Sequence, residues 1–92
     1  VRALGRRGDV AWGISTSGRS RNVVRACRTA REHGLATIGM TGRGGPLADG
    51  ADLAFTVASD VTARIQEVHL TLAHLLCELV ERALFPEGGA LP

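Results

Sequence analysis

The feature that most constrains the fold is a long amphipathic pattern near the C-terminus. Apolar residues recur there at helical steps, mostly of three and four. They predict one stripe of a helix over residues 61–84, formed by Val61, Ile65, Val68, Leu72, Leu75, Leu76, Leu79 and Ala83. Asp60 is the expected N-cap of this helix. At 1.5 Å per residue the helix is about 36 Å long, which is long for a domain of this size.

The opposite side of this helix predicts a second contact surface. It carries a set of residues too apolar for open solvent: Gln66, Leu70, Ala73, His74 and Cys77. A helix covered on two sides in a chain of 92 residues indicates association of subunits. His69 lies nearer the first stripe, and we expect it to be a packed or rim histidine.

The rest of the chain predicts an α/β fold. Short apolar runs at residues 10–15, 36–40 and 53–57 predict strands, and the first of them is typical of a strand buried on both faces. A helix is expected at residues 21–33 and a single helical turn at residues 47–49. This order of elements favours a parallel sheet with right-handed crossovers. Three strands make a thin sheet, and the chain starts without Met. We therefore expect residues 1–86 to be part of one domain whose N-terminal elements are missing or are replaced by a partner, and residues 87–92 to be a disordered tail.

Composition excludes several classes of protein. The 11 basic residues nearly balance 9 acidic ones, and aromatic residues are scarce, so we expect no nucleic-acid partner. No signal peptide and no apolar run of the roughly 18 to 20 residues that a membrane span needs is visible. We expect a cytoplasmic protein with no membrane partner. Cys27 and Cys77 lie in apolar helical patterns, where a free cysteine acts as a small hydrophobic residue.

Residues 15–20, which we call the serine loop, are the first candidate site. Four hydroxyl side chains (Ser15, Thr16, Ser17 and Ser20) stand between a strand and a helix N-terminus. The free amides and the dipole at a helix start suit a phosphate, and Gly18 lets the backbone approach closely. The pattern matches neither a Walker loop nor a G-x-G-x-x-G fingerprint, so no nucleotide cofactor is expected. An ordinary serine-rich cap and turn is the alternative. For the glycine-rich loop over residues 41–45, a plain turn is the favoured interpretation.

His74 is the second candidate. An imidazole at this position is suited to general acid/base catalysis or to metal binding, and spacing alone favours a packed interface histidine. Gln66 lies eight residues before it, about 12 Å along the helix axis. One small ligand reaches both only if it is extended or if the two residues belong to neighbouring subunits.

Two motifs together carry a family resemblance. The stretch Gly13-Ile14-Ser15-Thr16-Ser17-Gly18-x-Ser20, preceded by Gly8-Asp9-Val10, is the first. The second is Arg64-Ile65-Gln66-Glu67-Val68-His69 followed by His74. With these motifs the chain resembles the C-terminal half of the phosphoheptose isomerases, which are sugar isomerase (SIS) domain proteins with a three-layer, flavodoxin-like parallel sheet.

The resemblance implies an aldose–ketose isomerase that interconverts sedoheptulose 7-phosphate and D-glycero-D-manno-heptose 7-phosphate, for nucleotide-activated and lipopolysaccharide heptose. It implies that Ser15, Thr16, Ser17 and Ser20 hold the substrate phosphate. Gln66 would bind substrate or metal, and His74 would be a catalytic acid/base and, in zinc-containing members, a zinc ligand. It also implies a homotetramer with active sites between subunits.

The family's catalytic glutamate and a further metal-ligand histidine belong to the N-terminal half, so we expect this chain alone to be inactive. A related branch of the family is a regulator that associates with the replication initiator. It shares a stretch like Ala63-Arg64-Ile65-Gln66-Glu67, but carries Arg where Ser17 stands and Asn where His74 stands. Since both Ser17 and His74 are present here, the enzyme is favoured. A module that senses a sugar phosphate without turning it over is the third hypothesis.

Overall fold

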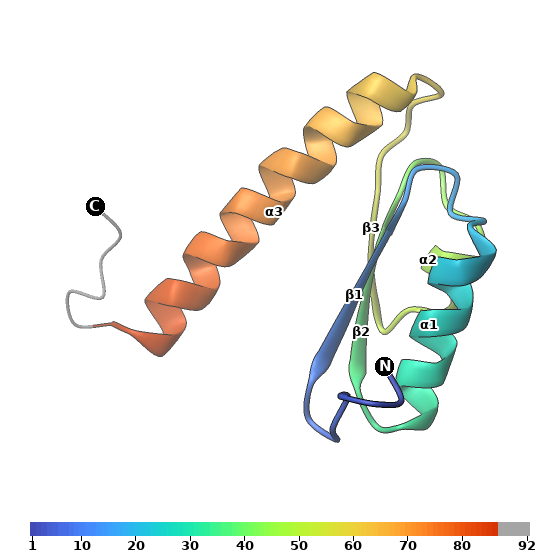
Figure 1. The fold of residues 1–92 in the computed structure, drawn as a ribbon. Coiled ribbons are helices and arrows are strands. Elements are labelled where there is room, and N and C mark those ends of the chain that lie inside the picture. Colours follow the sequence, from blue (N-terminus) through green and yellow to red (C-terminus); the bar gives the residue numbers. More distant parts are fainter. Residues whose placement is uncertain (87–92) are drawn as a thin grey trace.

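The computed structural model describes residues 1–86 and contains a three-stranded parallel sheet with two helices on one face and a long last helix that runs away from the sheet (Figure 1). The strands β1 (Val10–Ser15), β2 (Ala36–Thr41) and β3 (Leu53–Thr56) lie side by side in this order. The helices are α1 (Arg21–Glu32), α2 (Pro46–Gly50) and α3 (Thr62–Leu84). The predicted α/β class, parallel sheet and long last helix are confirmed. The tail predicted at residues 87–92 lies outside the described residues.

Helices α1 and α2 cover one face of the sheet closely because small residues face them. Gly13 of β1 pairs in register with Gly39 of β2. A Cβ atom at Gly13 would lie 2.7 Å from the Sγ of Cys27 and 2.9 Å from a methyl of Val23. The helix therefore packs against bare backbone at this point. Cys27 is buried as predicted, and its burial raises the pKa of the thiol.

The other face of the sheet is largely open, which corrects the expectation that the first strand is buried on both faces. Side chains alternate between the two faces of a strand, and Val10, Trp12 and Ile14 of β1 all lie on the face away from α1. All three are exposed, as is Leu53 of β3. Residues 1–86 supply no helix layer over these side chains, because α3 begins at the carboxyl edge of the sheet and diverges from it (Figure 1).

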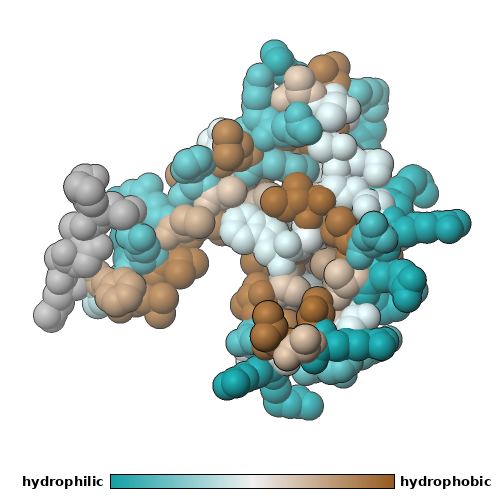
Figure 2. Space-filling model, in the orientation of Figure 1, coloured by the Kyte–Doolittle hydropathy of each residue, from teal (hydrophilic) through white to brown (hydrophobic). Residues whose placement is uncertain are grey.

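Helix α3 is attached to the sheet only near its beginning. Ile65 and His69 are its buried residues, whereas Val68, Leu75 and Leu79 of the predicted stripe are 40%, 50% and 59% exposed. The helical spacing was predicted correctly, but the burial of the whole stripe was wrong for the described chain. Apolar side chains gather along α3 and over the neighbouring part of the sheet (Figure 2). Cys77 is also exposed, in contrast to the packed cysteine predicted there.

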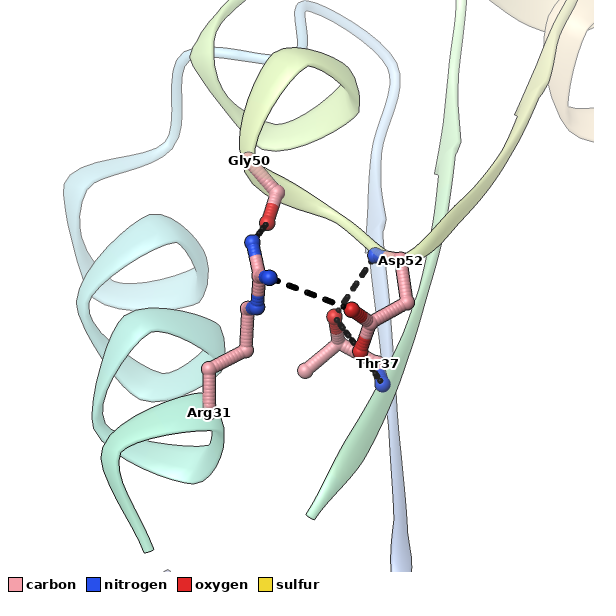
Figure 3. A network of polar contacts seen from close by, with 4 residues as sticks. All are labelled: Arg31, Thr37, Gly50 and Asp52. Atoms are coloured by element: carbon pink, nitrogen blue, oxygen red, sulfur yellow. Dashed lines mark hydrogen bonds and ion pairs between the residues drawn. The ribbon is translucent and has the colours of Figure 1, made fainter. Parts of the chain in front are cut away.

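A polar network holds the beginning of β3 against β2 and α1 (Figure 3). The carboxylate of Asp52 accepts hydrogen bonds from the backbone amide of Thr37 (2.8 Å) and from its hydroxyl (3.1 Å). Arg31 donates to the carbonyl oxygen of Gly50 (2.8 Å) and forms an ion pair with Asp52 (3.3 Å). The bonds from Thr37, reinforced by the charge of Arg31, lower the pKa of Asp52.

Within residues 1–86, no helix combines the length and apolarity needed to cross a bilayer.

Candidate functional site

Three loops meet at the carboxyl edge of the sheet. The strands are parallel, and Ser15, Thr41 and Thr56 stand at adjacent register positions at their ends. The serine loop follows β1. The glycine-rich loop follows β2 and begins at residue 42, because Thr41 is the last residue of that strand, and residues 57–61 lead from β3 into α3. In open α/β sheets, ligands bind at this edge. The sheet therefore brings the predicted phosphate loop together with two further loops.

The serine loop is organised by its own hydroxyl groups. The backbone amide of Gly18 donates to the Oγ of Ser15 (3.1 Å), and the amide of Arg19 donates to the Oγ of Ser17 (3.1 Å). The two Oγ atoms lie 3.3 Å apart. Ser15 is buried and Ser17 is exposed. Ser15 therefore shapes the loop from inside, while Ser17 presents its hydroxyl at the surface.

The glycine-rich loop locks the serine loop in place. Gly18 has φ +68°, and a Cβ atom on it would collide with the carbonyl oxygen of Gly44. The amide of Gly42 donates to the carbonyl oxygen of Thr16, and the amide of Leu47 donates to that of Gly18, both at 3.0 Å. The interpretation of this loop as a plain turn is therefore incomplete, because its glycines allow two backbones to touch.

The N-terminus of α1 completes this side of the site. Ser20 is the N-cap residue, its carbonyl oxygen accepts the first helical bond from the amide of Val24 (2.9 Å), and its side chain caps no amide of the helix. The first amides of a helix have no intrahelical acceptor, and the helix dipole adds positive potential there. The arrangement of hydroxyls, amides and dipole can hold a phosphate.

A polar hollow of about 270 Å³ lies beside the serine loop. It is lined by side chains from all three loops and from the beginning of α3: Thr16, Ser17, Arg43, Ser59, Asp60, Thr62 and Ile65. The Nε of Arg43 donates to a carboxylate oxygen of Asp60 at 2.6 Å, and this bond lowers the pKa of Asp60. Asp60 is therefore not the N-cap that the sequence predicted; Val61 takes that position without a side-chain bond.

Gln66 and His74 stand on α3, away from these loops. Both side chains are exposed, and neither lines the hollow. Eight residues of straight helix put them about 12 Å apart along the axis. Among residues 1–86, no group of three or more His, Cys, Asp or Glu side chains is placed to hold a metal ion. The described chain thus groups Ser15, Thr16, Ser17 and Ser20 at one edge and leaves Gln66 and His74 separate from them and from each other.

Sequence reasoning did not single out Arg43, Ser59 or Thr62 as part of the site. The available signal was positional, because residues that follow parallel strands gather at the same edge of a sheet. Applied to the segment after residue 57, this rule would have included Ser59 and Thr62.

Comparison with known proteins gives consistent matches. Residues 1–42 match the SIS domain family model. The chain is 59% identical to the phosphoheptose isomerase of Roseiflexus sp. over 88 residues, which are 95% of this chain and 45% of that protein. It is 57% identical to the phosphoheptose isomerase of Nitratidesulfovibrio vulgaris over 92 residues, 99% of this chain and 44% of that protein.

Two solved structures have the same fold. The phosphoheptose isomerase of Neisseria gonorrhoeae aligns with a TM-score of 0.83 at 47% identity, over 86% of this chain and 46% of that one. The phosphoheptose isomerase of Francisella tularensis aligns with a TM-score of 0.81 at 36% identity, over 87% of this chain and 46% of that one.

These matches define the class of protein that the chain is similar to, which is the SIS domain family. Within that family it corresponds to roughly the C-terminal half of the phosphoheptose isomerases, as the two sequence motifs predicted. The chain spans just under half the length of the curated relatives it matches.

Proposed function

We propose that this chain forms the C-terminal half of an isomerase that interconverts sedoheptulose 7-phosphate and D-glycero-D-manno-heptose 7-phosphate. The observation that carries the proposal is the interlocked serine loop at the N-terminus of α1, in a chain 59% identical to a phosphoheptose isomerase. Its alternative, a serine-rich cap, is less well supported because Ser20 caps no amide with its side chain.

The serine loop would bind the phosphate group and so fix one end of the sugar. Ser17 and Ser20 would donate hydroxyl hydrogen bonds, with Thr16 beside them, while Ser15 keeps the loop in shape through its bond with Gly18. Hydrogen bonds to a charged phosphate are stronger than neutral ones. Arg43 lines the neighbouring hollow and would add positive charge if the ligand displaces Asp60 from its guanidinium group.

The reaction would proceed by proton transfer through an enediol. A base removes a proton from C1 of the ketose, and the electron pair forms the C1–C2 double bond as the C2 oxygen takes up a proton. Returning a proton to C2 while O1 loses its own gives the aldose. These transfers need a base and an acid at separate positions. His74 would serve one of them and Gln66 would hold the substrate, while the second acid/base group would come from outside this chain.

The active form would be a homo-oligomer, for which we propose a tetramer. His74 does not line the hollow beside the serine loop, and apolar residues of the α3 stripe are exposed. Sites formed between subunits account for both features, since a neighbouring copy then covers α3 and supplies the missing side chains.

Zinc fits this chain only in part. Gln66 and His74 are too far apart on one helix to bind the same ion, and residues 1–86 contain no cluster of ligands. In a zinc-containing isomerase the remaining ligands would come from other segments or subunits.

We further propose that the protein acts in the cytoplasm, because a phosphorylated sugar is charged and does not cross membranes unaided. The regulator and sugar-phosphate sensor hypotheses predict binding without turnover. They are separated from the enzyme by the experiment that follows.

Turnover of sedoheptulose 7-phosphate by the intact gene product tests the proposal. The parent should produce the aldose, and His74→Ala should lower kcat by about 10² or more, as loss of a general acid/base does. His33→Ala is the matched control, because His33 is exposed and its ring only bonds the carbonyl oxygen of Thr29. A folded parent that binds the sugar phosphate without turnover would support the sensor, and one that neither binds nor turns it over would support the regulator.

A further inference from the structure

Helix α3 is joined to the sheet at two adjacent points. Its buried residues, Ile65 and His69, are each only 4% exposed and lie one helical turn apart. Both contact the end of β2. A Cβ atom on Gly42 would lie 2.8 Å from the Cδ1 of Ile65, and the Nε2 of His69 lies 2.8 Å from the carbonyl oxygen of Thr41. The direction of the whole helix therefore depends on these two contacts.

The bond from His69 connects α3 to the phosphate site through Thr41. A carbonyl oxygen only accepts hydrogen bonds, so Nε2 is the protonated nitrogen of the ring. The same carbonyl oxygen accepts a bond from the amide of Val57 at 3.2 Å. Thr41 also pairs in register with Ser15, the first residue of the serine loop. The carbonyl oxygen of Thr41, at the end of β2, thus binds both α3 and the segment after β3. This point lies next to the first residue of the serine loop.

Packing alone does not explain a histidine at this position. Its Nδ1 is buried and has no hydrogen-bond partner within residues 1–86. A buried acceptor without a partner is unfavourable, and an apolar side chain of similar size would avoid that cost. The hydrogen bond that the ring does make is directional, and it fixes both the rotation and the tilt of α3 relative to β2.

We propose that His69 is a positioning residue of the isomerase. Through its Nε2–H bond to Thr41 it sets where Gln66, three residues earlier, and His74, five residues later, stand relative to the serine loop. This inference rests on the proposed function, since it concerns how that site is assembled. The hydrogen bond of His69 goes to the backbone of Thr41, a residue to which we assign no chemical role.

Two substitutions at this position separate positioning from packing in the intact gene product. In His69→Gln the side-chain amide can still donate near the position of Nε2, whereas His69→Leu fills space without a donor. We expect kcat per folded protein to fall at least about tenfold in His69→Leu and to stay within about threefold in His69→Gln. KM should change less than kcat, because the serine loop is untouched. Leu35→Ala is the control, since Leu35 is buried at the opposite edge of the sheet and should lower Tm without lowering kcat.

A His69→Leu protein with the kcat of the parent, or a His69→Gln protein as impaired as His69→Leu, would overturn the proposal. Hydrogen exchange provides a readout that does not need activity. Protection of the amides of residues 62–69 should be lost in His69→Leu and kept in His69→Gln. If the parent has no isomerase activity, the proposed function fails. The exchange pattern then decides the positioning role alone, and equal protection in all three proteins would refute it.

Discussion

The backbone of Gly18 lies against the carbonyl oxygen of Gly44, so closely that no side chain fits between them. This contact joins the serine loop to the glycine-rich loop that follows the neighbouring strand. The amide bonds from Gly42 and Leu47 act on the same pair of loops. The phosphate-binding conformation that we propose therefore depends on both loops.

Replacing Gly18 should destroy the loop rather than merely strain it. Gly18→Ala adds a Cβ atom at φ +68° and forces it into the backbone of Gly44. We expect loss of sugar-phosphate binding by calorimetry and a lowered Tm. Gly8→Ala is the matched control, because Gly8 also has a positive φ (+93°) but no atom within 4 Å of the added carbon. Gly8→Ala should cost only the conformational penalty of about 1–2 kcal/mol. Equal effects of the two substitutions on binding would contradict the interlocked loops.

Ser17 should contribute directly to binding of the phosphate. Its hydroxyl is exposed beside the polar hollow, and it is held by the amide of Arg19. Ser17→Ala removes one hydrogen bond to a charged group, so KM for the sugar phosphate should rise about tenfold with a smaller change in kcat. Thr71→Ala is the comparison, because the Thr71 hydroxyl bonds only to its own helix. An unchanged KM in Ser17→Ala would place the phosphate elsewhere.

The sequence predicted local structure and the serine loop well, because both depend on residues close together along the chain. Helical spacing placed α3, and the run of apolar residues placed β1, to within one residue at each end. Burial was predicted less well, since it depends on which other segments or subunits pack against a side chain. Leu75 and Leu79 have the spacing of core residues, yet nothing in residues 1–86 covers them. The contact between Asp60 and Arg43 spans 17 residues, and no short-range pattern predicts such a pair.

The network around Asp52 should make stability depend on pH in acid. The folded chain lowers the pKa of this carboxyl group, so its ionised form stabilises the fold above the unfolded pKa. This contribution is lost as the pH falls through the lower, folded value. Asp52→Asn should therefore have a lower Tm than the parent at pH 7, and the difference should shrink from about pH 4 downward.

The control for this series is Asp49→Asn. Asp49 lies on the neighbouring helix α2, and its carboxylate makes no ion pair or hydrogen bond among residues 1–86. The Tm of the Asp49→Asn protein should equal that of the parent at every pH. A difference between Asp52→Asn and the parent that grows as the solution becomes more acidic would show that the sign of our argument is wrong.

The exposed stripe of α3 should be covered by association of subunits in the intact gene product. Leu79 is 59% exposed and stands in the last two turns of α3. Leu79→Asp places a charge in the proposed interface. The oligomeric state measured by sedimentation should therefore change from a tetramer to smaller species. Arg82→Asp introduces the same side chain at an exposed position that, among residues 1–86, bonds only to Glu78 of its own helix, and it should weaken the tetramer less. A parent that sediments as a monomer would rule out sites formed between subunits.

The central claim is that the site moves a proton between two carbons of a phosphorylated sugar. It is tested most directly by incubating the intact gene product with sedoheptulose 7-phosphate in D₂O and following the product by NMR. An enediol path with exchangeable acid/base groups predicts an aldose heptose phosphate that carries deuterium at C2. Folded protein that binds the sugar phosphate and forms no aldose would contradict the account.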